Sequence, residues 1–289
     1  MVTGSGRGFG RSVAVAYAME GARVVSVART RQELDRTADI IHARGGEVLT
    51  VPVDLSRIDE ICRLRDEVLG AFGRLDVLFN NAAISPWKTI EEMTVEDWDR
   101  TIAVNLRAPF LLTKAFLGAM RAQGGASIVN VTSGSAARGF VAELAYCPSK
   151  FGLEGLTQCL ALELRPHNVA VNSLNVAAPA GKTLKPTSLT EAQAEAVPEQ
   201  VRARYADMGS MVRAFGEAWV FVALQNASGV TGQRLGTRRL AEELRRDGWE
   251  ATVARYRGKL TQAVYEPYDF PRSVRCQTPD GGWKELKYE

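Results

Sequence analysis

The sequence has few of the residues that build metal sites and disulfide frameworks. Its 289 residues include four cysteines and two histidines. They are Cys62, Cys147, Cys159, Cys276, His42 and His167. The cysteines show no CxxC spacing, and the histidines lie far from each other and from any cysteine cluster. We therefore predict neither a zinc site nor a disulfide framework, and no other metal site.

Strong charge of one sign and long apolar runs are also missing. The net charge of +3 and the pI near 8.7 are too mild to indicate nucleic-acid binding. Arginines gather between Arg234 and Arg257, but acidic residues interrupt them, which indicates a solvated helix face. No apolar run approaches the roughly 20 residues that cross a bilayer, and the first residues lack the order of a signal peptide. We expect a cytoplasmic protein that binds neither nucleic acid nor membrane.

Most of the chain alternates short apolar, β-branched runs with longer amphipathic stretches, as repeated βαβ units do. The predicted strands cover residues 22–28, 47–53, 75–80, 126–132 and 169–174, and long helices are predicted between them. The strands are apolar almost throughout, which indicates that helices cover both faces of the sheet. The sequence thus predicts an α/β fold: a Rossmann-type, doubly wound parallel sheet with helices on both faces.

Two later segments depart from this alternation. Residues 176–210 are rich in Ala, Pro, Thr and Glu, and we interpret them as a mobile substrate loop with one or two helices. The predicted Rossmann-type catalytic domain covers residues 1–236, and a C-terminal extension, residues 237–289, packs on it. Two short helices and a hairpin turning at Asp280 and Gly281 are expected in the extension.

The chain opens with a glycine-rich stretch, "TGSGRGFG", from Thr3 to Gly10. Its Gly4, Gly8 and Gly10 let a strand turn sharply, the backbone approach a pyrophosphate, and the next helix present its N-terminal amides. Only Met1 and Val2 precede the stretch, so we predict a truncated first strand. A late start-codon assignment or a trimmed chain would explain it, and the upstream coding DNA is expected to continue in frame with an apolar run.

The choice of dinucleotide depends on the residue that follows the second strand. NAD enzymes of this architecture usually carry Asp or Glu there, to bind the ribose 2′-hydroxyl. This chain has Arg29, whose guanidinium suits a 2′-phosphate, and Arg7 in the glycine loop supplies a second positive group. The sequence favours NADP(H), with NAD(H) possible. The alternative is that Arg29 and Arg31 are solvated residues at a helix start.

The stretch "YCPSK" places Tyr146 and Lys150 one helical turn apart on one face. A phenol titrates near pH 10, so it exchanges protons well at neutral pH only where its anion is stabilised, and a neighbouring ammonium does this. Ser133 directly follows a predicted strand, at the sheet edge where ligands of open α/β folds bind. Asn105, on the long preceding helix, adds a fourth polar group.

The ordered set "TGSGRGFG", "VDL", "NNAA", "VNL", Ser133, "YCPSK" and "VTGQ" resembles the short-chain dehydrogenase/reductase family over roughly residues 1–235. This resemblance implies a dinucleotide held across the strand ends and a Ser-Tyr-Lys-Asn catalytic group. Tyr146 would be the general acid or base, and Lys150 would lower its pKa and bind the nicotinamide ribose.

The resemblance also implies roles for four further residues and an oligomeric state. Ser133 would hold the substrate oxygen, and Asn105 would anchor a water in the proton relay. Asp54 would contact adenine, and Asn81 would line the adenosine side. A homodimer or homotetramer is also implied.

Two functional hypotheses follow. The first is hydride transfer between NADP(H) and a secondary alcohol or carbonyl substrate. The second is a non-catalytic dinucleotide-binding or scaffold protein of the same fold, because the first strand is short and "NVAAPAGKT" stands where the family usually has Ser-Pro-Gly.

Overall fold

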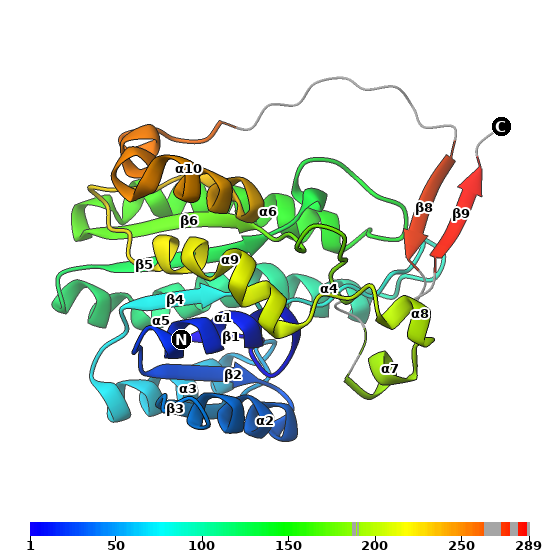
Figure 1. The fold of residues 1–289 in the computed structure, drawn as a ribbon, viewed down its shortest axis with the longest axis horizontal. Helices are drawn as coiled ribbons and strands as arrows, with labels where there is room; N and C mark the ends of the chain where they lie inside the picture. Colours follow the sequence, from blue (N-terminus) through cyan, green and yellow to red (C-terminus); the bar gives the residue numbers. More distant parts are fainter. Residues whose placement is uncertain (187–188, 190, 263–272, 278–282, 288–289) are drawn as a thin grey trace.

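The computed structural model describes residues 1–186, 189, 191–262, 273–277 and 283–287. A seven-stranded parallel sheet in the order β3-β2-β1-β4-β5-β6-β7 forms its centre (Figure 1). The strands are β1 Val2–Thr3, β2 Val24–Ala28, β3 Val48–Pro52, β4 Val77–Asn80, β5 Ala126–Thr132, β6 Val169–Asn175 and β7 Arg234–Gly236. The reversal of strand order between β1 and β4 makes the sheet doubly wound, as predicted.

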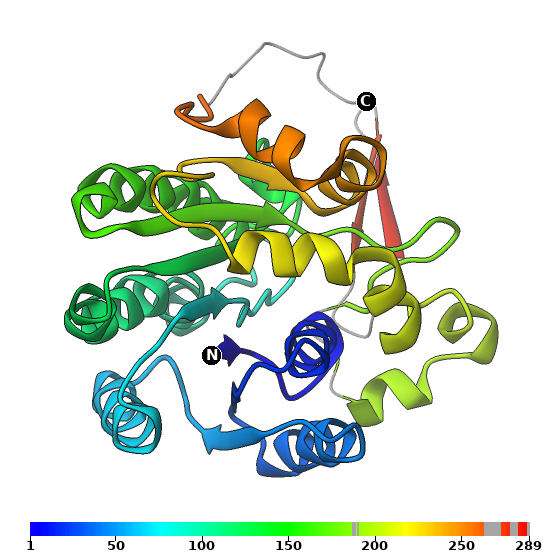
Figure 2. The same cartoon turned by 60° about the vertical axis from the view of Figure 1, so that its left-hand side comes forward.

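Helices cover both faces of the sheet (Figure 2). The longer ones are α1 Gly8–Met19, α2 Arg31–His42, α3 Ile58–Phe72, α4 Val95–Ile102, α5 Ala108–Ala122, α6 Tyr146–Glu163, α9 Met208–Ala223 and α10 Thr237–Tyr256. Shorter ones are η1 Ala103–Arg107, η2 Gly134–Ala136, η3 Arg165–His167, α7 Glu191–Ala196 and α8 Glu199–Arg202. Side chains of α1, α2, α9 and α10 share one buried apolar cluster, and those of α3, α5 and α6 share another. The predicted cover on both faces is confirmed.

One long helix, predicted as continuous, is built from three pieces. α4 and α5 join through η1, a turn of π-helix, so the run from Val95 to Ala122 is unbroken. By length and hydropathy alone this run could cross a membrane, but 44% of its most apolar window is buried within the protein. Its apolar side chains therefore serve the core, where α5 contributes Leu112 and Phe116.

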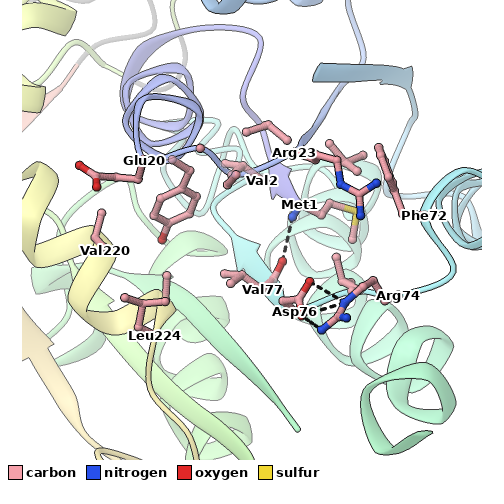
Figure 3. A pocket seen from close by; sticks show the side chains of 17 residues that line it. Met1, Val2, Glu20, Arg23, Phe72, Arg74, Asp76, Val77, Val220 and Leu224 are labelled. Carbon is pink, nitrogen blue, oxygen red and sulfur yellow. Dashed lines mark hydrogen bonds and ion pairs between the residues drawn. The ribbon is translucent and has the colours of Figure 1, made fainter. Parts of the chain in front are cut away.

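The first strand is short. β1 pairs with both neighbours, in the registers Val2↔Ser26 and Val2↔Phe79. The amino group of Met1 points toward β4 and donates a hydrogen bond to the carbonyl oxygen of Val77 at 2.8 Å (Figure 3). A cavity of about 380 Å³ lies beside it, between the first residues of β2 and β4.

Two helices, α7 and α8, lie in the segment 176–210, within the expected number. In the C-terminal extension α10 is interrupted at Gly248, whose φ of +78° is not helical, so two helical pieces follow β7 as predicted. Strands β8 Ser273–Gln277 and β9 Trp283–Lys287 then pair antiparallel. The predicted turn at Asp280 and Gly281 lies outside the described residues.

Candidate active site

The carboxyl ends of the parallel strands meet at one edge of the sheet, toward which the arrows of Figure 1 point. A cavity of about 390 Å³ opens at this edge. Its walls come from the glycine loop, from the ends of β2 and β5, from the start of α6 and from the segment 176–210. Parallel strands bring these segments together although they are far apart in the sequence.

The glycine loop turns from β1 into α1, and two of its glycines are required by close packing. Gly4 has φ +66°, and a Cβ there would lie 2.8 Å from the Cα of Ala82. At Gly10 a Cβ would collide with the carbonyl of Gly4 and with Asn81. Gly8 has φ +56° and faces open space in the cavity. The loop therefore packs tightly against β4 on one side and leaves its backbone accessible on the other.

Thr3 and Asn81 tie this loop to the end of β4. The hydroxyl of Thr3 accepts hydrogen bonds from the backbone N–H groups of Asn81 and Ala82, each at 3.0 Å. The side-chain amide of Asn81 donates to the carbonyl oxygens of Thr3 at 2.9 Å and Gly4 at 3.2 Å. Asn81 lines the cavity, so it both supports the loop and borders the space beside it.

Both predicted arginines border the cavity. Arg29 follows β2 and is exposed. The Nε atom of Arg7 lies 3.5 Å from a carboxylate oxygen of Glu33 on α2, so this guanidinium already has an acidic neighbour. An anionic group bound here would interact with Arg29 directly and would compete with Glu33 for Arg7.

Asp54, after β3, is held in its charged form. Burial opposes the charge, but hydrogen bonds from the N–H and hydroxyl of Ser56, and the nearby Arg100 and Arg29, keep the pKa of Asp54 below its usual value. Asp54 also lines the cavity and lies close enough to Arg29 to interact with its charge.

Tyr146 and Lys150 lie in the first turns of α6 and face the cavity. The Lys150 ammonium lies 5.5 Å from the centre of the Tyr146 ring and donates to the carbonyl oxygen of Val131 on β5 at 2.8 Å. Burial lowers the pKa of Lys150 to about 8, against the opposing effect of Glu154 one turn further along α6. Burial raises the pKa of Tyr146, and a hydrogen bond from Ser133 counteracts part of that rise.

Ser133 follows β5 and caps the short helix η2. Its hydroxyl accepts from the N–H of Ser135 and lies within hydrogen-bond distance of the Ser135 hydroxyl, both at 3.2 Å. Its own carbonyl oxygen accepts a hydrogen bond from Arg234 at 2.9 Å. The hydrogen bond from Arg234 thus fixes the main chain of Ser133 at the carboxyl end of β5, and the Ser133 hydroxyl lies next to the phenol of Tyr146.

Asn105 lies in η1 and is buried. Its side chain forms two hydrogen bonds with the backbone of Ile84, both at 2.9 Å, and a third with the hydroxyl of Ser149 at 3.0 Å. Turns of π-helix are frequent at functional sites because the widened backbone redirects one side chain. Here Asn105 connects the loop after β4 to α6 at the residue preceding Lys150.

The structure brings most of the predicted residues to one cavity. Gly4, Arg7, Gly8, Gly10, Arg29, Asp54, Asn81, Tyr146 and Lys150 line it. Thr3, Ser133 and Asn105 contact lining residues. Sequence analysis missed Glu154 and Arg234, which form an ion pair at 3.1 Å behind Ser133. The spacing of Glu154 from Lys150 was a visible signal. The interpretation of Arg234 as part of a solvated helix face is wrong, because it lies in β7 with its side chain only 28% exposed.

Comparison with known proteins agrees with this geometry. A family model described as short chain dehydrogenase matches residues 1–193. L-xylulose reductase from Bos taurus is 38% identical over 176 residues, which is 61% of this chain and 69% of the relative.

Two solved structures are also similar. A metagenomic short-chain oxidoreductase in complex with NADP is 40% identical, with a TM-score of 0.59 over 62% of this chain and 80% of the other. A structure from Beutenbergia cavernae with NADP at low occupancy is 33% identical, with a TM-score of 0.68 over 86% and 95%. By its fold, its site and these similarities, the chain belongs to the short-chain dehydrogenase family.

Proposed function

We propose that this protein is an oxidoreductase that transfers a hydride between NADP(H) and a secondary alcohol or carbonyl carbon. The observation that carries the proposal is the pairing of Tyr146 and Lys150 in the same cavity as the glycine loop and Arg29. A dinucleotide-binding loop and a proton-exchanging pair in one space are the two parts that such a reaction needs.

The residues of the cavity fit such a dinucleotide. The open backbone at Gly8 and the N-terminus of α1 suit a pyrophosphate, because unpaired N–H groups and the helix dipole favour negative charge there. Arg29 suits a 2′-phosphate, since a guanidinium binds phosphate oxygens through two parallel hydrogen bonds. When bound, the nicotinamide supplies or accepts the hydride.

The chain's own residues then handle the proton and the oxygen. Tyr146 exchanges the proton of the substrate hydroxyl, and Lys150 favours the charged form of the phenol. Ser133 and Tyr146 donate hydrogen bonds to the substrate oxygen, where negative charge develops. Asn105 fixes the position of the loop after β4 relative to α6. A water bound near Asn105 would complete the proton path.

The similar proteins support the cofactor and the substrate class. Two similar structures contain NADP. The relative named L-xylulose reductase suggests that sugars and polyols belong in the substrate panel.

The test is a panel of alcohols, polyols, ketones and keto sugars, assayed by the absorbance of NADPH and NADH in parallel. Turnover with at least one substrate, faster with NADPH, is expected. Tyr146→Phe should lower kcat by about 100-fold or more, because it removes the proton donor. NADPH binding, measured by fluorescence, should stay within about twofold and serves as the control. Undiminished turnover in Tyr146→Phe would refute the catalytic assignment.

The alternative is a non-catalytic dinucleotide-binding or scaffold protein, favoured by the short β1 and by "NVAAPAGKT" after β6. It predicts NADPH binding without turnover across the whole panel. The same assay therefore separates the two functions.

A further inference from the structure

The corner between β7 and α10 holds the backbone at the carboxyl ends of β5 and β6. Arg234 donates to the carbonyl oxygen of Ser133 at 2.9 Å. Thr237 donates to the carbonyl oxygen of Asn175 at 2.7 Å, and Arg238 to that of Ala178 at 2.7 Å. Three side chains from one corner thus fix main-chain atoms around the site, although this part of the chain contributes nothing to the cavity walls.

Arg234 is the member of this set that contacts a catalytic segment, and its own position is fixed from two sides. Its Nε lies 3.1 Å from a carboxylate oxygen of Glu154, whose other oxygen accepts from the hydroxyl of Ser173 at 2.6 Å. Its backbone N–H donates to the hydroxyl of Thr261 at 2.9 Å. The side chains of Arg234 and Glu154 are only 28% and 15% exposed, so water screens this pair less than a surface pair.

The contact has a direct geometric consequence for Ser133. The Ser133 hydroxyl contacts both the phenol of Tyr146 and the hydroxyl of Ser135. If the backbone of Ser133 were free to rotate, the direction of this hydroxyl would change with it. A guanidinium bound to the Ser133 carbonyl restricts the peptide plane, and therefore the direction in which the side chain leaves the backbone. A catalytic donor is effective only if it is held close to its productive geometry.

We propose that Arg234, held by Glu154, is a positioning residue that fixes the backbone of Ser133 and so aims its hydroxyl at the reacting oxygen. This inference rests on the proposed function. It also gives part of the C-terminal extension a role, because Thr261 holds the β7 backbone that carries Arg234.

The test is a double-mutant cycle with Ser133→Ala. Arg234→Met keeps the apolar stem of the side chain and removes both polar contacts. In the otherwise wild-type protein it should lower kcat about 10-fold, with the NADPH dissociation constant within about twofold. If Arg234 acts through Ser133, the same substitution in the Ser133→Ala background should change kcat less than about twofold. A loss of kcat of equal size in both backgrounds would overturn the proposal, because the effect of a general structural role does not depend on which residue stands at position 133.

Further variants keep the test decisive if Arg234→Met folds poorly. Arg234→Lys retains the charge without the planar fork and should recover part of the activity. Glu154→Gln should also lower kcat, and because Glu154 favours the charged form of Lys150 as well, part of its effect should persist in the Ser133→Ala background. The matched control is Arg245→Met, which removes an exposed arginine that donates to the carbonyl of Ala214 at 3.3 Å, and it should behave as wild type.

A measurement without turnover completes the design. Amide hydrogen exchange over residues 133–137 should be faster in Arg234→Met than in Arg245→Met. Unchanged exchange there would overturn the proposal. If the wild-type protein shows no turnover, or if Ser133→Ala is fully active, the proposed function fails and this inference fails with it. If Ser133→Ala is impaired but Arg234→Met is not, only the positioning role is lost.

Discussion

At the scale of single residues, burial acts on Tyr146 and Lys150 in opposite directions. It raises the pKa of the phenol and lowers the pKa of the ammonium to about 8, since both changes favour the neutral form. Lys150 therefore changes charge close to neutral pH. Its neighbours decide how much charge it carries there, and among them Glu154 favours the charged form.

This shift predicts a pH-dependent stability. The unfolded chain holds the Lys150 proton up to about pH 10.5, whereas the folded chain releases it near pH 8. Between these values the unfolded state binds more protons, so the free energy of unfolding rises with pH, by roughly 3 kcal/mol for a shift of this size. Urea unfolding of wild type and Lys150→Met from pH 7 to pH 10 should show this rise in their difference. A difference independent of pH would contradict it.

A second prediction concerns Arg29 and the 2′-phosphate. Arg29→Ala should weaken NADPH binding about 10-fold, the loss of a charge-assisted contact at an exposed site, and change NADH binding less than about twofold. Glu33→Gln should strengthen NADPH binding, because it frees Arg7 from its acidic neighbour. Dissociation constants from fluorescence titration measure both effects.

The matched control for Arg29 is Arg31→Ala, since Arg31 pairs with Asp35 on the surface of α2 at 2.9 Å. It should leave both affinities unchanged. Equal results for the two arginine variants would show that Arg29 is only a solvated residue at a helix start.

At the scale of elements, the turn from β1 into α1 depends on tight packing against the end of β4. Gly10→Ala should lower the free energy of unfolding by about 1–3 kcal/mol and weaken NADPH binding, because the new methyl group collides with the Gly4 carbonyl and with Asn81. Gly70→Ala is the control, since Gly70 lies on α3 with nothing within 4 Å of the added Cβ. It should be neutral or stabilise by up to about 1 kcal/mol. Chemical denaturation compares them, and equal effects would contradict the packing argument.

At the scale of the whole molecule, the C-terminal helix α10 carries a buried carboxylate that joins its two pieces across the interruption at Gly248. Glu243 is 4% exposed and accepts hydrogen bonds from Arg239 at 2.9 Å and Tyr256 at 2.6 Å, with Arg255 at 3.4 Å. Leu240 and Leu244 on the same helix join the apolar cluster of α1 and α9. The polar contacts thus hold the two pieces of α10 together, and the apolar contacts make the helix part of the main core.

Removing that carboxylate should therefore loosen the contact between the two pieces of α10 and lower the stability of the protein. Glu243→Ala is expected to lower the free energy of unfolding by about 1–2 kcal/mol, because the half-buried Tyr256 and Arg255 lose their shared acceptor. The exposed Glu242→Ala should change it by less than about 0.5 kcal/mol. Both should unfold in one transition by fluorescence and circular dichroism. A separate early transition for α10 would show that the extension is an independent unit.

The boundary at residue 236 stays a prediction that this unfolding experiment tests. The homodimer or homotetramer also stays a prediction, and light scattering of the purified protein measures it. The cytoplasmic location and the lack of affinity for nucleic acid are likewise expectations.

The sequence by itself determined the doubly wound sheet and indicated most of the residues that line the cavity of the candidate site. These features are local patterns: apolar β-branched runs, glycines at a turn, and Tyr146 and Lys150 one helical turn apart. Local patterns can be recognised in the sequence without knowing which segments are neighbours in space. The position of Ser133 also followed, since the end of each parallel strand must lie at the same edge.

Only the tertiary structure decided how the site is supported. The π-helical turn at Asn105 interrupts a pattern that otherwise predicts an ordinary helix, and its hydrogen bonds reach Ile84 and Ser149, 21 and 44 residues away. Arg234 contacts Ser133 across 101 residues of sequence. Such contacts depend on where the folded sheet places β5, β7 and α6, and no local spacing of residues encodes that arrangement.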